Sequence, residues 1–229
     1  MMLNQAVPVI TLDGPSGTGK GTLCHQLANY LGWHVLDSGV LYRALGFIAD
    51  KHQIDIHQLD ALIQLAENLP IRFEQKEIFI EDESVGLALR TEVSGARASK
   101  LAAIPEVRLA LLQRQRNFAM LPGLVTDGRD MGTIVFPDAA LKIYLSASLT
   151  ERANRRYLQL KDSEKSVSLA QVVDELSKRD SRDMARLHAP LKAADDAVSI
   201  DTTCLTVEAV FQQLLQLINE RGFMGKRVE

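Results

Sequence analysis

The chain has 229 residues, of which 46% are hydrophobic and 24% charged. This composition is ordinary for a chain that folds around a substantial core, and it argues against disorder. The formal net charge of −3 creates no overall field that attracts polyanions, so we expect no nucleic-acid binding through a general basic surface and expect any anion to be recognised by local arginines.

Neither a targeting segment nor a membrane span is evident. The N-terminal residues lack a basic stretch followed by an apolar one, and no long apolar run occurs elsewhere. We therefore expect a protein of the cytoplasm, without a membrane partner, that works as a monomer. The two cysteines and five histidines show no metal-ligand spacing, which predicts no metal site built from protein side chains alone.

The first predicted strand, residues 7–12, runs into a glycine-rich loop that matches G-x-x-x-x-G-K-[ST] except at one position. The loop consists of Gly14, Pro15, Ser16, Gly17, Thr18, Gly19, Lys20, Gly21 and Thr22. Glycines let successive N–H groups surround phosphate oxygens, a helix beginning near Gly19 adds its positive end, and Lys20 reaches the outer phosphates. The sequence predicts a nucleoside triphosphate site; the alternative is a tight turn without a ligand. Gly21 stands where a magnesium-binding hydroxyl is usual, and Thr22 follows one place later.

The following segments are assigned from their hydrophobic periodicity. In chain order we expect a strand at 33–36, helices at 40–51 and 58–68, an antiparallel hairpin at 71–74 and 77–81 around Gln75 and Lys76, and a possible third strand at 85–89. Because the antiparallel patch interrupts an order in which strands and helices otherwise alternate, it predicts an inserted subdomain.

The alternation resumes after this insertion. We expect helices at 105–119 and 206–220, strands at 123–127, 141–145 and 198–201, and a helical stretch dense in charge from 150 to 191. Strands separated by helices imply a parallel sheet covered on both faces. The predicted fold class is therefore α/β, with a five-stranded parallel sheet.

Two carboxylates and a guanidinium lie at the carboxyl end of the predicted strand 123–127. They belong to Asp127, Arg129 and Asp130, and in open α/β sheets this is the edge where ligands bind. Asp127 is placed to hold magnesium directly or through water. The alternative is that Asp127 only caps a helix.

Arginines recur every three or four residues from Arg179 to Arg186, a spacing that keeps them near one helical face. Arg43, Arg129, Arg179 and Arg186 would compensate the charge of a transferring phosphoryl group if they converged. A solvated helix with surface ion pairs would show the same pattern.

Several blocks together carry a more specific signal. They are the loop 14–22, Asp37-Ser38-Gly39, Tyr42-Arg43, the segment 127–133 and the segment 179–183. In this order they resemble the bacterial cytidylate kinases, a family of P-loop nucleoside monophosphate kinases. The resemblance implies transfer of the γ-phosphoryl group of ATP to CMP or dCMP, with Mg²⁺ as cofactor.

The family's organisation is implied as well. The resemblance predicts a P-loop kinase domain whose core comprises residues 1–39, 103–150 and 190–229. Residues 40–102 would form a monophosphate-binding subdomain with a small β insertion at 71–89, and residues 151–189 a short helical lid.

The resemblance also assigns residues to ligands. It implies that ATP is bound by loop residues 14–22 and by Arg156, and that magnesium is held by Thr22 and Asp127. The implied catalytic residues are Lys20, Asp127, Arg129, Arg179 and Arg186. Those implied for CMP are Ser38, Arg43, Ser99, Arg108, Arg129, Asp130, Arg179, Asp183 and Arg186.

The chemistry of cytosine agrees with this assignment. A carboxylate such as Asp130 can accept the exocyclic amino hydrogen while the Arg108 guanidinium donates to the ring acceptors. Uracil would place a carbonyl against Asp130, so the site should discriminate between the bases. The alternative is an ordinary surface ion pair between these two residues.

Two rival functions stay open from the sequence. One is a P-loop kinase for another monophosphate or for an alcohol such as shikimate. The other is a nucleotide-dependent switch, although the Asn-Lys-x-Asp sequence that recognises guanine in such proteins is not found.

Overall fold

The computed structural model describes residues 7–74, 77–161 and 167–223. The chain forms two compact units, one made of residues 1–36 and 118–229 and the other of residues 37–117. Gln75 and Lys76, placed in the expected hairpin turn, and part of the expected lid lie outside the described residues. The division into core, monophosphate-binding subdomain and lid stays a prediction.

The first unit is built on a five-stranded sheet with the order β2-β6-β1-β7-β8. Its strands are β1 (Val9–Asp13), β2 (His34–Asp37), β6 (Leu124–Gly128), β7 (Leu141–Ser146) and β8 (Val198–Asp201). β1 is the central strand and is buried along its whole length, as expected for a parallel strand with neighbours on both sides. It pairs in parallel with β6 and β7, and β7 pairs in parallel with β8. The predicted α/β fold with a parallel sheet flanked by helices is confirmed.

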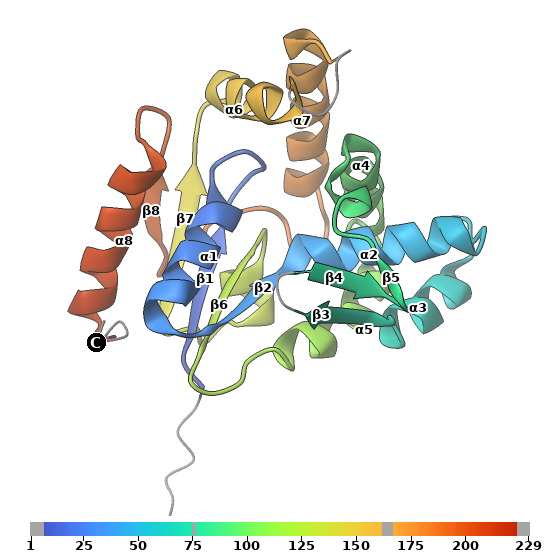
Figure 1. Ribbon diagram of the computed structural model, residues 1–229, viewed down its shortest axis with the longest axis horizontal. Helices are drawn as coiled ribbons and strands as arrows, with labels where there is room; N and C mark the ends of the chain where they lie inside the picture. The colour runs from blue at the N-terminus through green and yellow to red at the C-terminus, as the bar shows by residue number, and fades with distance from the viewer. Residues whose placement is uncertain (1–6, 75–76, 162–166, 224–229) are drawn as a thin grey trace, which may run out of the picture. The chain divides into compact units, whose positions relative to one another are not determined.

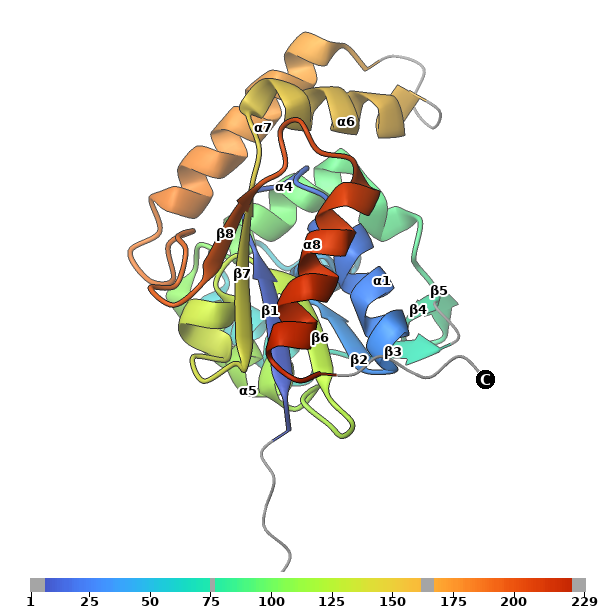
Figure 2. The ribbon, with the colours of Figure 1, turned by 90° about the vertical axis from the view of Figure 1, so that its left-hand side faces the viewer.

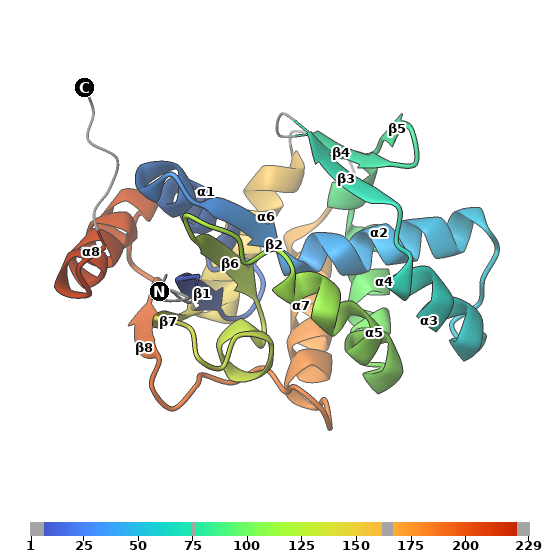
Figure 3. The ribbon, with the colours of Figure 1, turned by 90° about the horizontal axis from the view of Figure 1, so that it is seen from below.

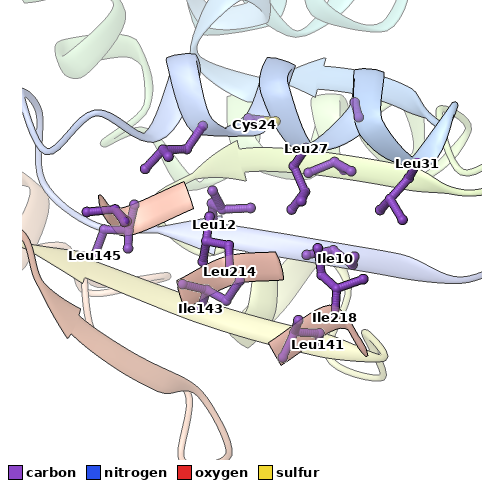
Figure 4. Packing of buried hydrophobic residues seen from close by; sticks show 14 of the residues in the cluster. Ile10, Leu12, Cys24, Leu27, Leu31, Leu141, Ile143, Leu145, Leu214 and Ile218 are labelled. Carbon is purple, nitrogen blue, oxygen red and sulfur yellow. The ribbon is translucent and has the colours of Figure 1, made fainter. Parts of the chain in front are cut away.

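Two amphipathic helices, α1 (Lys20–Leu31) and α8 (Val207–Glu220), lie over the same face of this sheet (Figure 2). Leu27 of α1 and Leu214 of α8 are fully buried against Leu12 of β1 and Ile143 of β7 (Figure 4). This apolar layer fixes the end of β1 relative to the start of α1, and the glycine-rich loop connects those two points.

The charged helical stretch expected at 150–191 contains two helices, α6 (Leu149–Lys161) and α7 (Leu169–Met184), which pack against each other beyond the carboxyl end of β7 (Figure 1). The residues from 185 to 191 are not helical, so the expected stretch extends too far at its C-terminal end. Ser168 begins α7 with a capping box in which its hydroxyl accepts from the Gln171 amide and Gln171 reaches back to the Ser168 amide. A short π-helical segment, η2 (Met131–Val135), follows β6.

The second unit collects four helices and a small antiparallel sheet (Figure 3). Its helices are α2 (Ser38–Lys51), α3 (Leu59–Glu67), α4 (Glu92–Leu101) and α5 (Pro105–Arg116). Its strands are β3 (Ile71–Glu74), β4 (Glu77–Ile80) and β5 (Glu83–Ser84), followed by the 3₁₀ turn η1 (Ala88–Arg90). The predicted hairpin is present, with Ile71 opposite Ile80.

Two expectations for this unit fail. The possible third strand at 85–89 is wrong, because the third strand is β5 and the chain then turns into η1. Val85 and Leu89 are both buried, and the Leu89 amide donates to the Val85 carbonyl across one turn, so their spacing reflects a turn and not a strand. Helix α4 was not predicted, since its small residues give no apolar stripe.

None of the helices within the described ranges is long and apolar enough to cross a lipid bilayer.

The shared layer of α1, α8 and the sheet predicts a strong effect of one truncation. Leu214→Ala should lower the free energy of unfolding by about 2–5 kcal/mol, because it leaves a cavity where a fully buried side chain was. Gln213→Ala, at an exposed position of the same helix, is the control and should change stability little. Urea unfolding measures both; equal midpoints for the two variants would contradict the packing described.

Candidate active site

The glycine-rich loop joins β1 to α1, and its backbone has the conformation that phosphate binding requires. Gly14, Gly17 and Gly19 adopt φ values of 144°, 82° and 91°, a region that other residues rarely enter. A Cβ on Gly14 would overlap the Leu145 carbonyl oxygen of β7, so the loop sits directly on the sheet edge. Gly19 is the N-cap of α1 and has no side chain to cap the helix, which leaves its first N–H groups for a ligand.

Lys20 is the first residue of α1 and is buried. Its Nζ donates to the Pro15 carbonyl of the loop at 2.7 Å. Burial and the neighbouring positive charges of Arg129 and Arg179 together lower the pKa of Lys20 to about 7, against the opposing effect of Asp127. Nearby carboxylates therefore balance the Lys20 ammonium only in part, and a phosphate would supply the missing negative charge.

Three other predicted site residues of this unit, Asp127, Arg129 and Arg179, lie within electrostatic range of Lys20. Asp127 is inside β6, opposite Leu12 of β1, and it is buried. The residue that precedes the next helical segment is Asp130, so the alternative that Asp127 caps a helix does not hold. The structure brings the predicted lysine, carboxylate and arginines to one edge of the sheet.

Asp183 joins two of the predicted arginines. Its Oδ2 accepts from Nε of Arg129 at 2.9 Å, and its Oδ1 accepts from Arg186 three residues further along the chain. Asp183 and Arg186 are almost completely buried and Arg129 largely so. Burial alone would raise the pKa of Asp183, but Arg129, Arg186 and Arg179 outweigh it and hold this pKa below its ordinary value. These arginines therefore do not lie on a solvated surface helix, the alternative that the sequence left open.

Arg152 is a contact of the loop that the sequence did not reveal. From the start of α6 its guanidinium donates to the carbonyls of Ala147 and Ser16 and forms an ion pair of 2.6 Å with Asp180 of α7. One buried side chain thus ties the loop to the helix that carries Arg179. Arg156, which the resemblance assigned to ATP, lies half-buried one turn along α6 and donates to Gln159.

Asp13 is a second residue that the sequence analysis missed. It ends β1, is buried, and accepts hydrogen bonds from two consecutive amides, those of Met131 and Gly132. Burial is the main cause that raises the pKa of Asp13, and it outweighs the two amides and Lys20, so that the pKa is about 6. The sequence signal that could have identified Asp13 is a charged residue at the end of an apolar strand.

The remaining predicted CMP residues belong to the second unit. Ser38 is the first residue of α2, and it is buried as Ser99 of α4 is. Arg43 donates to the Leu89 carbonyl at 2.7 Å and to the Thr91 carbonyl at 3.3 Å. Arg108 donates to the Ala102 carbonyl, and its guanidinium carbon lies 5.8 Å from the centre of the Tyr42 ring. The predicted pairing of Arg108 with Asp130 joins residues of different units and stays a prediction.

Asp127 and Thr22 are the residues expected to hold magnesium. The Thr22 hydroxyl is exposed in the first turn of α1, and the Asp127 carboxylate lies near Lys20. Both offer the hard oxygen ligands that Mg²⁺ prefers, so the donor set fits this ion together with phosphate oxygens and water. Within the described ranges, no group of three His, Cys, Asp or Glu side chains could hold a metal ion.

The loop, the lysine in α1 and the cationic edge of the sheet define a P-loop nucleotide-binding protein of the kinase type. A family model described as cytidylate kinase matches residues 10–220. The chain belongs to the cytidylate kinase family.

Individual relatives agree with the family. The cytidylate kinase of Stutzerimonas stutzeri is 52% identical over 225 residues, which cover 96% of this chain and 98% of that protein. The cytidylate kinase of Aeromonas salmonicida is 51% identical over 215 residues, or 92% of this chain and 94% of the relative. A solved structure of an uncharacterised protein from Eubacterium ventriosum aligns with a TM-score of 0.50 at 12% identity, covering 93% of this chain and 98% of that one, which shows a shared fold alone.

The buried ion pairs of Asp183 make it sensitive to substitution. Asp183→Asn should lower the free energy of unfolding at pH 7 by about 3–5 kcal/mol, because Arg129 and Arg186 would lose the charge that balances them. The control is Asp174→Asn on the same helix. It breaks an exposed ion pair with Lys178 and should cost less than about 1 kcal/mol.

The same substitution predicts a pH dependence. Because the folded-state pKa of Asp183 lies below the ordinary 3.8, its stabilisation is complete above that pH and is lost as the pH falls through the folded value. The difference in stability between the wild type and Asp183→Asn should therefore shrink below about pH 4. Urea unfolding at several pH values measures this, and a constant difference down to pH 2 would contradict it.

Proposed function

We propose that this protein transfers the γ-phosphoryl group of ATP to CMP or dCMP, which yields ADP and CDP or dCDP. The observation that supports this most is the gathering of Lys20, Arg129 and Arg179 beside the glycine-rich loop, in a chain about half identical to proteins named cytidylate kinase. Phosphoryl transfer needs two phosphates in line and compensation of the charge on their oxygens, and little covalent chemistry from the protein.

ATP would bind through the loop 14–22. The amides at the start of α1 and in the loop would donate to phosphate oxygens. The Lys20 ammonium would give up its hydrogen bond to the Pro15 carbonyl and donate to the outer phosphates instead. Anionic oxygens at this place would raise the lowered pKa of Lys20 and keep it protonated. Arg156 is the proposed additional contact for ATP.

Asp127 and Thr22 are proposed to hold Mg²⁺, directly or through water. When bound, the ion would neutralise part of the charge on the phosphate oxygens. The side chain of Asp127 is fixed for this task by its position in β6, since both neighbouring residues of that strand are buried in the sheet.

The arginines are proposed to bind the phosphate of CMP and the transferring phosphoryl group. Arg129 and Arg186 are held in place by Asp183 before any substrate arrives, which spares the cost of ordering them. Arg179 extends this positive edge from α7, and Arg43 of the second unit is the fourth proposed phosphate ligand. Asp183 is the proposed contact for a sugar hydroxyl, since a carboxylate oxygen can accept more than one hydrogen bond.

Cytosine selection is proposed to depend on Asp130, with Ser99 and Arg108 as further contacts to the base and Ser38 near the phosphate or sugar. Asp130 is almost completely buried, so a uracil carbonyl placed against its carboxylate would be penalised more than at an exposed position. Action as a monomer in the cytoplasm stays a prediction.

The proposed function is tested by coupled assays of ADP formation with CMP, dCMP, UMP, AMP and shikimate as acceptors. Turnover should be greatest with CMP and dCMP, because Asp130 accepts from an amino group that uracil lacks. Greater turnover with AMP or shikimate would assign the protein to another branch of the P-loop kinases. ATP binding without acceptor-stimulated turnover would favour a nucleotide-dependent switch.

Asp130→Ala tests the proposed base contact. The ratio of kcat/KM for CMP to that for UMP should fall by about 5- to 150-fold, which corresponds to about 1–3 kcal/mol for one unmatched buried polar group. Asp138→Ala, which removes the same charge at an exposed position of the same stretch, should leave the ratio unchanged. Equal losses with CMP and UMP for Asp130→Ala would remove Asp130 from base selection.

A further inference from the structure

Asp13 holds the chain segment that follows β6. It lies in register between Gly128 of β6 and Tyr144 of β7, at the carboxyl end of the central strand. Its Oδ1 accepts from the Met131 amide at 2.8 Å and its Oδ2 from the Gly132 amide at 2.7 Å. Both carboxylate oxygens thus accept hydrogen bonds from one short stretch of backbone that is far from Asp13 in the sequence.

These two amides come directly after Asp130. The direction of the Met131 N–H is set by rotation about the Cα–C bond of Asp130, whose backbone has φ −148° and ψ 23°. A hydrogen bond from that N–H to a carboxylate on a rigid strand therefore fixes the ψ angle of Asp130. The Gly132 amide fixes the next peptide in the same way, and charge-assisted bonds to a carboxylate are the stronger kind.

The close approach of this segment to β1 adds a second constraint. A Cβ on Gly132 would lie 2.8 Å from Oγ1 of Thr11, two residues before Asp13 on the same strand. The segment is therefore held against β1 by contact as well as by hydrogen bonds. No shift of the peptides after Asp130 is possible without moving one of these groups.

We propose that Asp13 is a positioning residue for base selection: through the amides of Met131 and Gly132 it sets the backbone of Asp130, and with it the choice of CMP over UMP. Asp13 itself does not touch the base. This inference rests on the proposed function, because it needs CMP as the substrate. It adds a residue outside the set assigned to CMP.

The experiment compares Asp13→Asn with the wild type in steady-state kinetics. Asparagine keeps one acceptor oxygen but turns an NH₂ group toward a backbone N–H, so one of the two bonds is lost. KM for CMP should rise about 10-fold or more, and the CMP-to-UMP ratio of kcat/KM should fall at least 5-fold, since small displacements of positioned groups cost up to roughly 10²-fold. KM for ATP should rise less than KM for CMP, because Asp13 acts on Lys20 only through its charge, whereas it holds the segment after Asp130 by two hydrogen bonds.

The ATP measurement separates positioning from damage to the loop, because Asp13 directly precedes Gly14. A rise of KM for ATP with an unchanged CMP-to-UMP ratio would overturn the inference. Ile10→Ala is the matched control: it opens a cavity on the same strand and lowers stability without removing either hydrogen bond. Ile10→Ala should keep the wild-type ratio, and an equal loss of selectivity in this control would also overturn the inference.

Gly132→Ala provides a second test if Asp13→Asn does not fold. It keeps the carboxylate and displaces the segment, because the new Cβ meets Thr11. The CMP-to-UMP ratio should fall again, and an unchanged ratio counts against the inference. If the wild type does not phosphorylate CMP, the proposed function is refuted. If the wild type prefers CMP and the Asp13→Asn variant keeps the same CMP-to-UMP ratio, only the inference about Asp13 is refuted.

Discussion

Positive charge buried at the carboxyl edge of the sheet has to be balanced before any substrate is present. Asp183 balances Arg129 and Arg186, and Asp180 balances Arg152. The charge of Lys20 is less well balanced by carboxylates, and its pKa is lowered as a result. The edge is therefore built to receive further negative charge, and phosphates meet this need because they bring anionic oxygens that accept several hydrogen bonds at once.

The same balance explains how α6 and α7 belong to the site. Arg152 reaches from α6 to the Ser16 carbonyl of the loop and to Asp180, while Asp183 reaches from α7 to Arg129 after β6. Two carboxylates three residues apart on α7, those of Asp180 and Asp183, thus pair with arginines from two other parts of the chain. These ion pairs hold Arg129, Arg152 and Arg186 in place, and under the proposed function this would lower the entropy lost when a nucleotide binds.

The sequence alone predicted the sheet and the loop well, because an apolar strand, a glycine pattern and a helical stripe are local signals. It failed where packing overrides local pattern: Val85 and Leu89 belong to a turn, and α4 carries small residues without an apolar stripe. The contacts of Asp13 with the Met131 amide and of Arg152 with the Ser16 carbonyl were missed because each pair lies more than a hundred residues apart in the chain. The roles assigned to site residues still depend on the family resemblance.

The proposed function needs the cations at this edge to bind the phosphate of the acceptor nucleotide. A crystal structure of the protein with CMP bound would test this. We expect the phosphate oxygens of CMP to lie within hydrogen-bond distance of Arg129 and Arg186, with Asp183 still in contact with both. A CMP phosphate bound away from these two arginines would contradict it.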